Sequence, residues 1–293
     1  MSDTFFTASP HWRWLIILYF FVGGIAGGGY FVAALLQWFG RPDDRPVIRT
    51  GYALGFWGAI ISGALLTLDL GRPLRFWHMV FQSENFPSLM FKSWSPISFG
   101  AWAVLLFGAC AALSWWEERR GRATTVWVKL VAGLGGIFGF FVAGYTGVLL
   151  SVTNRPIWAD SPWLGALFLA SGASTGTAAL MLFARRRGAS ESSIRWLASF
   201  DARVLIVELL ILIIFIASLW PIRQVWISFW GFLLLIGVVG AGILWPLRLH
   251  FTNPGTGFRN PAVMVLLGGF LLRVVVLLAS NSIAVHHVAS GGS

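Results

Sequence analysis

Charged residues are scarce in this sequence. Of its 293 residues, only 11% are Asp, Glu, Lys or Arg, whereas 57% are hydrophobic. A soluble globular domain carries about 25% charged residues, so this chain has too few to cover a water-exposed surface. The sequence therefore excludes an ordinary soluble domain, and most of the chain must lie in lipid.

Cysteine is almost absent. The single Cys110 lies inside an apolar run, where we interpret it as a small buried side chain. One thiol cannot close a disulfide within the chain, and it cannot hold an iron–sulfur cluster or a structural zinc ion. A cleavable signal peptide is not evident either, because the N-terminus lacks its basic region and its small-residue cleavage site. The first apolar run is therefore expected to stay as a helix.

Histidine pairs within apolar runs are also missing. A haem held between two membrane helices needs such a pair, but all five histidines lie near the ends of runs or between them: His11, His78, His250, His286 and His287. We therefore expect no haem and no iron–sulfur cluster in this chain. If the protein takes part in redox chemistry, the electron carrier must be a lipid-soluble molecule such as a quinone. A partner protein must then hold the next redox centre.

Long apolar runs dominate what is present. Each is close to the ~20 residues that a helix needs to cross a bilayer. We predict an all-α integral membrane protein with about eight transmembrane helices, at residues 13–39, 48–69, 94–116, 126–151, 161–184, 201–220, 226–247 and 261–282. Proline is expected at helix ends, with Pro246 ending the seventh run and Pro261 opening the eighth. Glycine clusters inside the runs, such as Gly27-Gly28-Gly29, indicate close packing of helices.

The distribution of Lys and Arg predicts an orientation. We call the membrane face at which the first run begins side A, and the opposite face side B. Side B carries fourteen of the 21 basic residues and Arg273 lies within the last run, which leaves six for side A: Arg13, Arg72, Arg75, Lys92, Arg155 and Arg223. The basic excess of this +10 chain lies in short loops, so it indicates orientation and not nucleic-acid binding. We expect side B in the cytoplasm, with both termini facing outward across a bacterial inner membrane.

Polar residues gather under side A. Asp69 ends the second run, Arg72 and His78 follow in the next loop, and Tyr145 lies six residues before the end of the fourth run, about 9 Å deep. A quinone site needs hydrogen-bond donors and a proton route, which such residues supply. Other interpretations remain open at this stage. Asp69 and Arg72 are also consistent with an ion pair that fixes the loop, Tyr145 with an interfacial tyrosine, and His78 with a solvated loop residue.

Two charged residues lie within the predicted spans. Glu208 falls in the sixth run and Arg273 in the eighth. An unpaired charge at that depth costs several kcal/mol, so each should have a partner or access to water. A structural Glu208–Arg273 pair is one interpretation, and a step in proton transfer is the other.

Several segments together resemble the NrfD family, which includes the membrane subunit of polysulfide reductase. The most specific is the Asp-Leu-Gly-Arg-Pro motif at residues 69–73, and the resemblance covers most of the chain in the expected order. The segments that carry it are Asp69–Phe76, Ser95–Trp102, Tyr145–Leu150, Asn260-Pro261, Gly268-Gly269 and Arg273.

The resemblance implies two four-helix bundles, here residues 1–155 and 156–293. It also implies a site for a quinone, menaquinone or ubiquinone, in the first bundle near the outer face. Tyr145 matches a quinone-contacting tyrosine of such proteins. Their first helix also contributes polar contacts, but here Trp14–Phe21 has no inward histidine or asparagine, so His11 and Tyr19 are the substitutes.

The resemblance further implies a docked ferredoxin-like iron–sulfur subunit, with a molybdopterin or multihaem catalytic subunit beyond it. We therefore interpret the chain as a quinone-binding membrane anchor that exchanges electrons with that partner. Two other classes remain as alternatives. A transporter or ion pathway is disfavoured because no second half-repeat with broken helices is evident. A purely structural anchor without a quinone site is equally compatible with polar loops.

Overall fold

Apolar helices make up almost all of the structure. The computed structural model describes residues 14–82, 88–122, 124–153, 155–252 and 259–290. Its long helices are α1 (Trp14–Phe39), α2 (Arg45–Asp69), α3 (Pro96–Arg119), α4 (Val126–Ser151), α5 (Leu164–Arg185), α6 (Glu191–Ser218) and α9 (Arg259–Ser290). Three short 3₁₀ helices join them: η1 (Pro42–Asp44), η2 (Pro73–Met79) and η3 (Trp220–Ile227). Within the described ranges, extended pairing is limited to one bridge between Phe81 and Leu89.

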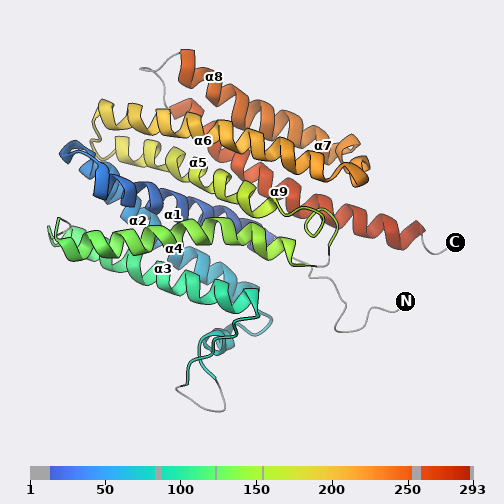
Figure 1. The fold of residues 1–293 in the computed structure, drawn as a ribbon, viewed down its shortest axis with the longest axis horizontal. Helices are drawn as coiled ribbons and strands as arrows, with labels where there is room; N and C mark the ends of the chain where they lie inside the picture. The colour runs from blue at the N-terminus through green and yellow to red at the C-terminus, as the bar shows by residue number, and fades with distance from the viewer. Residues whose placement is uncertain (1–13, 83–87, 123, 154, 253–258, 291–293) are drawn as a thin grey trace.

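Successive helices lie side by side and run in opposite directions, as expected for a chain that crosses a membrane repeatedly (Figure 1). Seven helical segments among the described residues are long and apolar enough to cross a membrane. The eighth, α6, has 28 residues and is about 42 Å long, but Asp201, Arg203 and Glu208 lower its apolar character. The prediction of an all-α membrane protein with about eight spanning helices is confirmed.

The seventh span is built from three consecutive pieces. These are α7 (Phe229–Leu233), the π-helical stretch η4 (Leu234–Leu244) and α8 (Trp245–Thr252). The prediction that Pro246 ends this span is wrong. Pro246 lies inside a continuous helical span, directly after the π-helical stretch, in which the Trp245 amide donates to the Gly240 carbonyl five residues back. We attribute the accommodation of the proline to these wider π turns, since a proline in a helix interior has no N–H to donate. The helix therefore continues to Thr252 and includes His250.

The start of α6 was also predicted too late, at residue 201. The helix begins at Glu191 because Ser190 caps it, with the Ser190 hydroxyl accepting a hydrogen bond from the Ser193 amide. The first turns of α6 are therefore helical although they are not apolar. This extension brings Arg195 and Ser199 onto the same helix as Asp201.

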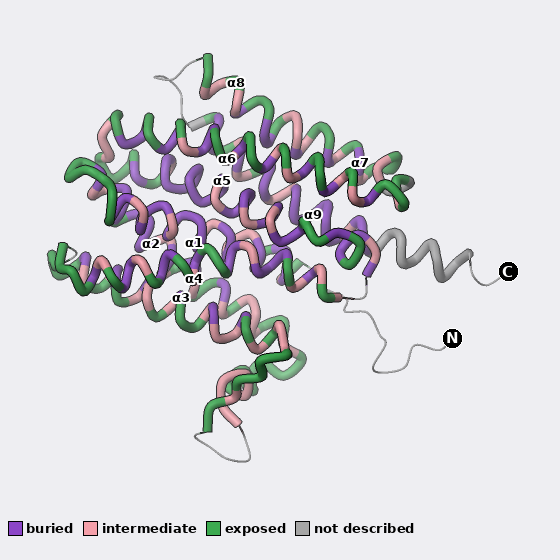
Figure 2. Tube along the Cα trace, in the orientation of Figure 1, coloured by how far each residue is buried: buried purple, intermediate pink, exposed green. Residues whose placement is uncertain are grey.

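α1 and α5 form the buried centre of the structure (Figure 2). α1 packs against α2, α4 and α5, and glycines let these backbones meet. A Cβ on Gly27 would overlap the Gly139 carbonyl of α4, and a Cβ on Gly28 would overlap the Gly172 carbonyl of α5. The prediction that glycine clusters serve close helix packing is confirmed. Since α5 contacts both α4 and α6, the proposed division into 1–155 and 156–293 stays a prediction.

One segment departs from the helices. The side A arm, which we define as residues 70–82 and 88–95 between α2 and α3, extends from their side A ends away from the other helices (Figure 1). The described part of the arm includes η2, and several of its side chains are exposed, Leu74 at 89% and Trp94 at 80%.

Candidate functional site

Three hydroxyl groups lie at similar depths below side A, on three different helices. Tyr19 is five residues into α1, Ser62 is seven residues before the end of α2, and Tyr145 is six before the end of α4. At 1.5 Å per residue each lies about 8–11 Å from its helix end. All three side chains are buried. We call Tyr19, Ser62 and Tyr145 the hydroxyl cluster.

Neighbouring contacts show that these three side chains are close together. Tyr19 and Tyr145 are near enough to interact electrostatically. Tyr19 and Ser62 both lie within 4 Å of the position that a Cβ on Gly23 would occupy. The structure therefore brings together two of the predicted site residues, Tyr19 and Tyr145, and adds Ser62, which the sequence analysis did not single out.

Tyr145 is held against α3. Its hydroxyl donates a hydrogen bond to the Pro96 carbonyl, and its ring packs on Gly100, where any side chain would collide with it. Phe141 stacks on the same ring, with centroids 5.5 Å apart. The hydroxyl proton of Tyr145 is thus already engaged by the protein.

Ser62 differs from Tyr145 in its bonding. Its hydroxyl oxygen is buried and has no hydrogen-bond partner among the residues that the structure describes. A buried hydroxyl without a partner costs roughly 1–3 kcal/mol, so such groups usually meet a water molecule or a ligand. Ser62 therefore differs from Tyr145 in that its donor has no partner among the described residues.

The remaining predicted residues lie at the surface. Asp69 is exposed at the end of α2, and Arg72 is exposed in the side A arm. Among the described residues no ion pair within 4.0 Å joins these two, so the helix-end pair considered as an alternative is not formed. His78 is partly buried, stacks on Trp77 with ring centroids 3.8 Å apart, and its Nδ1 contacts the Arg75 carbonyl at 3.1 Å. His11 lies outside the described residues.

Arg155, counted above among the basic residues of the side A loops, is buried in the structure. It is 3% exposed, and its guanidinium lies 5.3 Å from the centre of the Trp158 ring. Burial lowers the pKa of this guanidinium below its usual value. The Trp158 indole in turn donates to the Val276 carbonyl at 2.8 Å. Arg155 therefore helps to fix the α4–α5 loop against α9 and is not accessible from outside.

A second group of buried polar residues lies between α5, α6, α8 and α9. Glu208 is 3% exposed and Arg273 is fully buried. The two interact electrostatically, but within the described ranges they make no contact as short as 4.0 Å, and Ser171 lies beside both. The predicted pair is thus indirect. The sequence analysis missed Asp201 and His250, whose side chains are hydrogen-bonded to each other close to this pair. A signal for Asp201 was available, because it lies seven residues before Glu208 and therefore on the same face of the helix.

Together the fold and these sites define a multi-pass α-helical membrane protein with a hydroxyl cluster below one face. The sequence pattern of the family described as "Polysulphide reductase, NrfD" matches residues 3–284, and the chain belongs to that family. It is therefore a membrane subunit of the respiratory oxidoreductase class.

Three relatives match over nearly their whole length. The protein is 28% identical to a protein NrfD homolog of Haemophilus influenzae, over 94% of its own length and 96% of the relative. It is 28% identical to protein NrfD of Escherichia coli, over 94% and 95%. It is 26% identical to the C subunit of polysulfide reductase of Wolinella succinogenes, over 92% and 94%.

Proposed function

We propose that this protein is the quinone-binding subunit of a respiratory oxidoreductase in a bacterial cytoplasmic membrane. It exchanges electrons between the quinone pool and a ferredoxin-like iron–sulfur subunit. A molybdopterin or multihaem subunit beyond that partner carries out the terminal chemistry. Reduction of a quinone takes two electrons and two protons, and oxidation of a quinol returns them. The partner holds the electron carriers, so this protein has to bind the quinone and exchange its protons.

The observation that carries the proposal is the hydroxyl cluster. Three residues that carry hydroxyls lie on three helices, each about 8–11 Å below one membrane face, a depth that a lipid-soluble head group reaches from the bilayer. Hydroxyls suit the task because each both donates and accepts hydrogen bonds. A quinone carbonyl needs a donor and a quinol hydroxyl needs an acceptor.

The bonding of Ser62 and of Tyr145 suggests a role for each of these two residues. Ser62, whose hydroxyl has no partner among the described residues, donates to a quinone carbonyl. The Tyr145 oxygen accepts from a quinol hydroxyl while its own proton stays on the Pro96 carbonyl, and rotation away from that carbonyl turns it into a donor. Asp69 is seven residues beyond Ser62 on α2 and exposed, so it exchanges protons with water at the outer end of the site.

The side A arm supports docking of the partner at this end. It combines exposed apolar side chains with exposed basic ones, among them Leu74, Trp94, Arg72 and Lys92. Apolar anchors surrounded by charges are the usual composition of a protein–protein interface. A partner on side A lies close to the hydroxyl cluster, which shortens the path for electrons. The relative from Wolinella succinogenes is named as one subunit of polysulfide reductase, in keeping with a multisubunit complex.

The experiment compares quinol-linked activity of the intact complex for Tyr145→Phe and Ser62→Ala. Losing one ligand hydrogen bond costs about 0.5–1.5 kcal/mol, which corresponds to an effect of roughly 2- to 12-fold on quinol KM or turnover. The matched control is Tyr52→Phe, which removes another buried tyrosine hydroxyl; this one lies near side B and has no hydrogen-bond partner among the described residues. It should leave quinol kinetics unchanged.

Co-purification of the partner subunit is measured in the same samples. Normal co-purification with slowed quinol kinetics supports the site. If both cluster variants keep wild-type kinetics in an intact complex, the quinone site is elsewhere or absent, and a purely structural anchor becomes the better description.

A further inference from the structure

Buried acid and base groups lie deep between α6 and α8. Asp201 is fully buried, and its Oδ2 lies 3.2 Å from Nε2 of His250, whose side chain is 3% exposed. The other carboxyl oxygen of Asp201 accepts a hydrogen bond from the Ser174 hydroxyl at 2.9 Å. Charged or titratable groups at such depth are expensive in a membrane and usually serve a function. The hydroxyl cluster does not use them.

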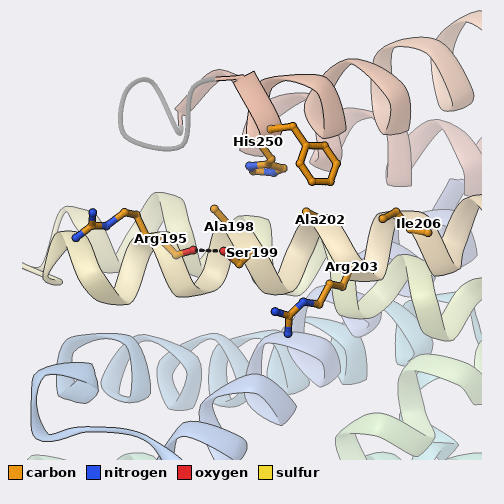
Figure 3. Close-up of a pocket in the computed structure, with 8 residues that line it drawn as sticks. Arg195, Ala198, Ser199, Ala202, Arg203, Ile206 and His250 are labelled. Atoms are coloured by element: carbon orange, nitrogen blue, oxygen red, sulfur yellow. Dashed lines mark hydrogen bonds between the residues drawn. The ribbon is translucent and has the colours of Figure 1, made fainter.

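A pocket of about 330 Å³ opens beside this group (Figure 3). Arg195, Ser199 and Arg203 of α6 line it, and His250 lines it from α8. Ser199 is eight residues from the first residue of α6, which places the pocket about 12 Å along the helix from its side B end. A water molecule takes about 30 Å³ in the liquid, so the pocket has room for several. His250 thus contacts both this space and the buried carboxyl of Asp201.

The buried group continues inward from Asp201. Glu208 is two turns further along α6, about 10 Å deeper, and interacts electrostatically with both Asp201 and Arg273. On the neighbouring α5, Ser174, which donates to Asp201, and Ser171 are one turn apart. Ser171 lies beside Glu208, and its hydroxyl accepts from Nη1 of Arg273 at 3.2 Å.

Arg273 closes the inner end. Its guanidinium donates to the Phe20 carbonyl of α1 at 3.0 Å and to the Gly269 carbonyl of α9 at 2.7 Å. It therefore stays in place as a fixed positive charge next to Glu208. The groups that face Asp201 are His250, Ser174 and Glu208, and those that face Glu208 are Asp201, Ser171 and Arg273. We call this set of six residues the polar chain.

We propose that the polar chain is a proton path from the side B pocket to Glu208. Water in the pocket exchanges a proton with His250, which passes it to Asp201. The Ser174 and Ser171 hydroxyls relay it to Glu208, each accepting one proton and releasing another. The net change is protonation of the Glu208 carboxylate by one proton from side B, and no electron is transferred. The path goes beyond the quinone proposal, whose proton exchange lies on side A.

The test follows the protonation of Glu208 directly. The full-length protein in lipid nanodiscs receives a rapid pH drop, and infrared spectroscopy records the band of the protonated carboxyl. Glu208→Gln should remove that band and so assign it. Ser174→Ala and His250→Asn should keep the band but slow its appearance by about tenfold or more, since a positioned proton donor typically contributes at least that much. The matched control is Glu191→Gln, an exposed carboxyl on the same helix that pairs with Arg185.

A second arm closes the pocket without touching the polar chain. In a Cys110→Ala background, Ser199→Cys is modified with a bulky thiol reagent, which should slow protonation of Glu208. Ser192→Cys, exposed on the same helix but outside the pocket, is the control and should have no effect.

Three outcomes overturn the proposal. The first is that Glu208→Gln removes no band, so that Glu208 does not titrate. The second is that correctly folded Ser174→Ala and His250→Asn both keep the wild-type rate, as expected if these residues only tie α5, α6 and α8 together. The third is that the plugged pocket leaves the rate unchanged. None of these measurements needs quinone turnover, so a failure here is separate from a failure of the quinone site.

Discussion

Replacement of Arg273 by methionine tests how the structure tolerates a charge at its centre. The guanidinium is fully buried and forms two hydrogen bonds to other helices, one to the Phe20 carbonyl of α1 and one to the Ser171 hydroxyl of α5. Side-chain hydrogen bonds within membrane proteins contribute about 0.6 kcal/mol on average and at most about 1.7. Loss of both bonds should therefore cost about 1–3 kcal/mol.

The electrostatic effect is larger. Without Arg273, Glu208 has no cation beside it while the Asp201 carboxyl remains nearby. Removal of one partner from a buried pair of charges costs about 3–5 kcal/mol. Arg273→Met should thus lower the free energy of unfolding by about 3–5 kcal/mol. The double change Arg273→Met with Glu208→Gln should lower it by only the 1–3 kcal/mol of the lost hydrogen bonds.

The assay is unfolding of the purified protein in mixed micelles, followed by circular dichroism as denaturing detergent is added. Arg203→Met serves as the control, because that arginine is exposed on α6 and should change stability by less than about 0.5 kcal/mol. Equal losses in the single and double variants would refute the reasoning, since they would show that Glu208 gains nothing from Arg273.

Three further predictions concern orientation, cofactors and packing. In a Cys110→Ala background, a thiol reagent should label Arg187→Cys only from the cytoplasm and Ala159→Cys only from outside. The reverse pattern in intact cells would show that the orientation is opposite to the predicted one. The purified protein should show no haem absorbance and bind no iron, and a stoichiometric haem spectrum would contradict this. Gly28→Leu should prevent assembly of the helices, because even a Cβ there overlaps the backbone of α5. Gly63→Ala is the control, since the space around Gly63 is open, and the yields of folded protein compare the two variants.

The fold was largely predictable because a lipid environment imposes one simple requirement. A segment that crosses the bilayer must satisfy its backbone as a helix and present about 20 apolar residues, and such runs are visible in the sequence. The errors arose where another effect controls the helix end. Ser190 caps α6 eleven residues before the apolar run, and Pro246 is accommodated inside a helical span where the π-helical stretch passes into α8.

The candidate site was harder to predict, for a physical reason. Distance from a helix end follows from residue number, so a common depth for Tyr19 and Tyr145 is available from the sequence. The direction in which a side chain points is not, because helices in lipid are apolar on all sides and give little periodic signal. Ser62 was missed for this reason. The burial of Arg155 was also not predicted. A cation near a helix end is as compatible with burial against Trp158 as with a solvated loop, and the sequence does not show which way its side chain points.

The two buried polar groups meet at α1. Arg273 of the polar chain bonds the Phe20 carbonyl, and the adjacent residue, Tyr19, belongs to the hydroxyl cluster. Glycines hold this stretch of α1 against its neighbours, and Arg273 occupies the space that a side chain on Gly24 would fill. A rigid, close-packed helix transmits a displacement at one end of such a contact to the other. A change of charge at Glu208 would alter the hydrogen bond between Arg273 and the Phe20 carbonyl. Through α1, this change would reach the hydroxyl groups around Tyr19.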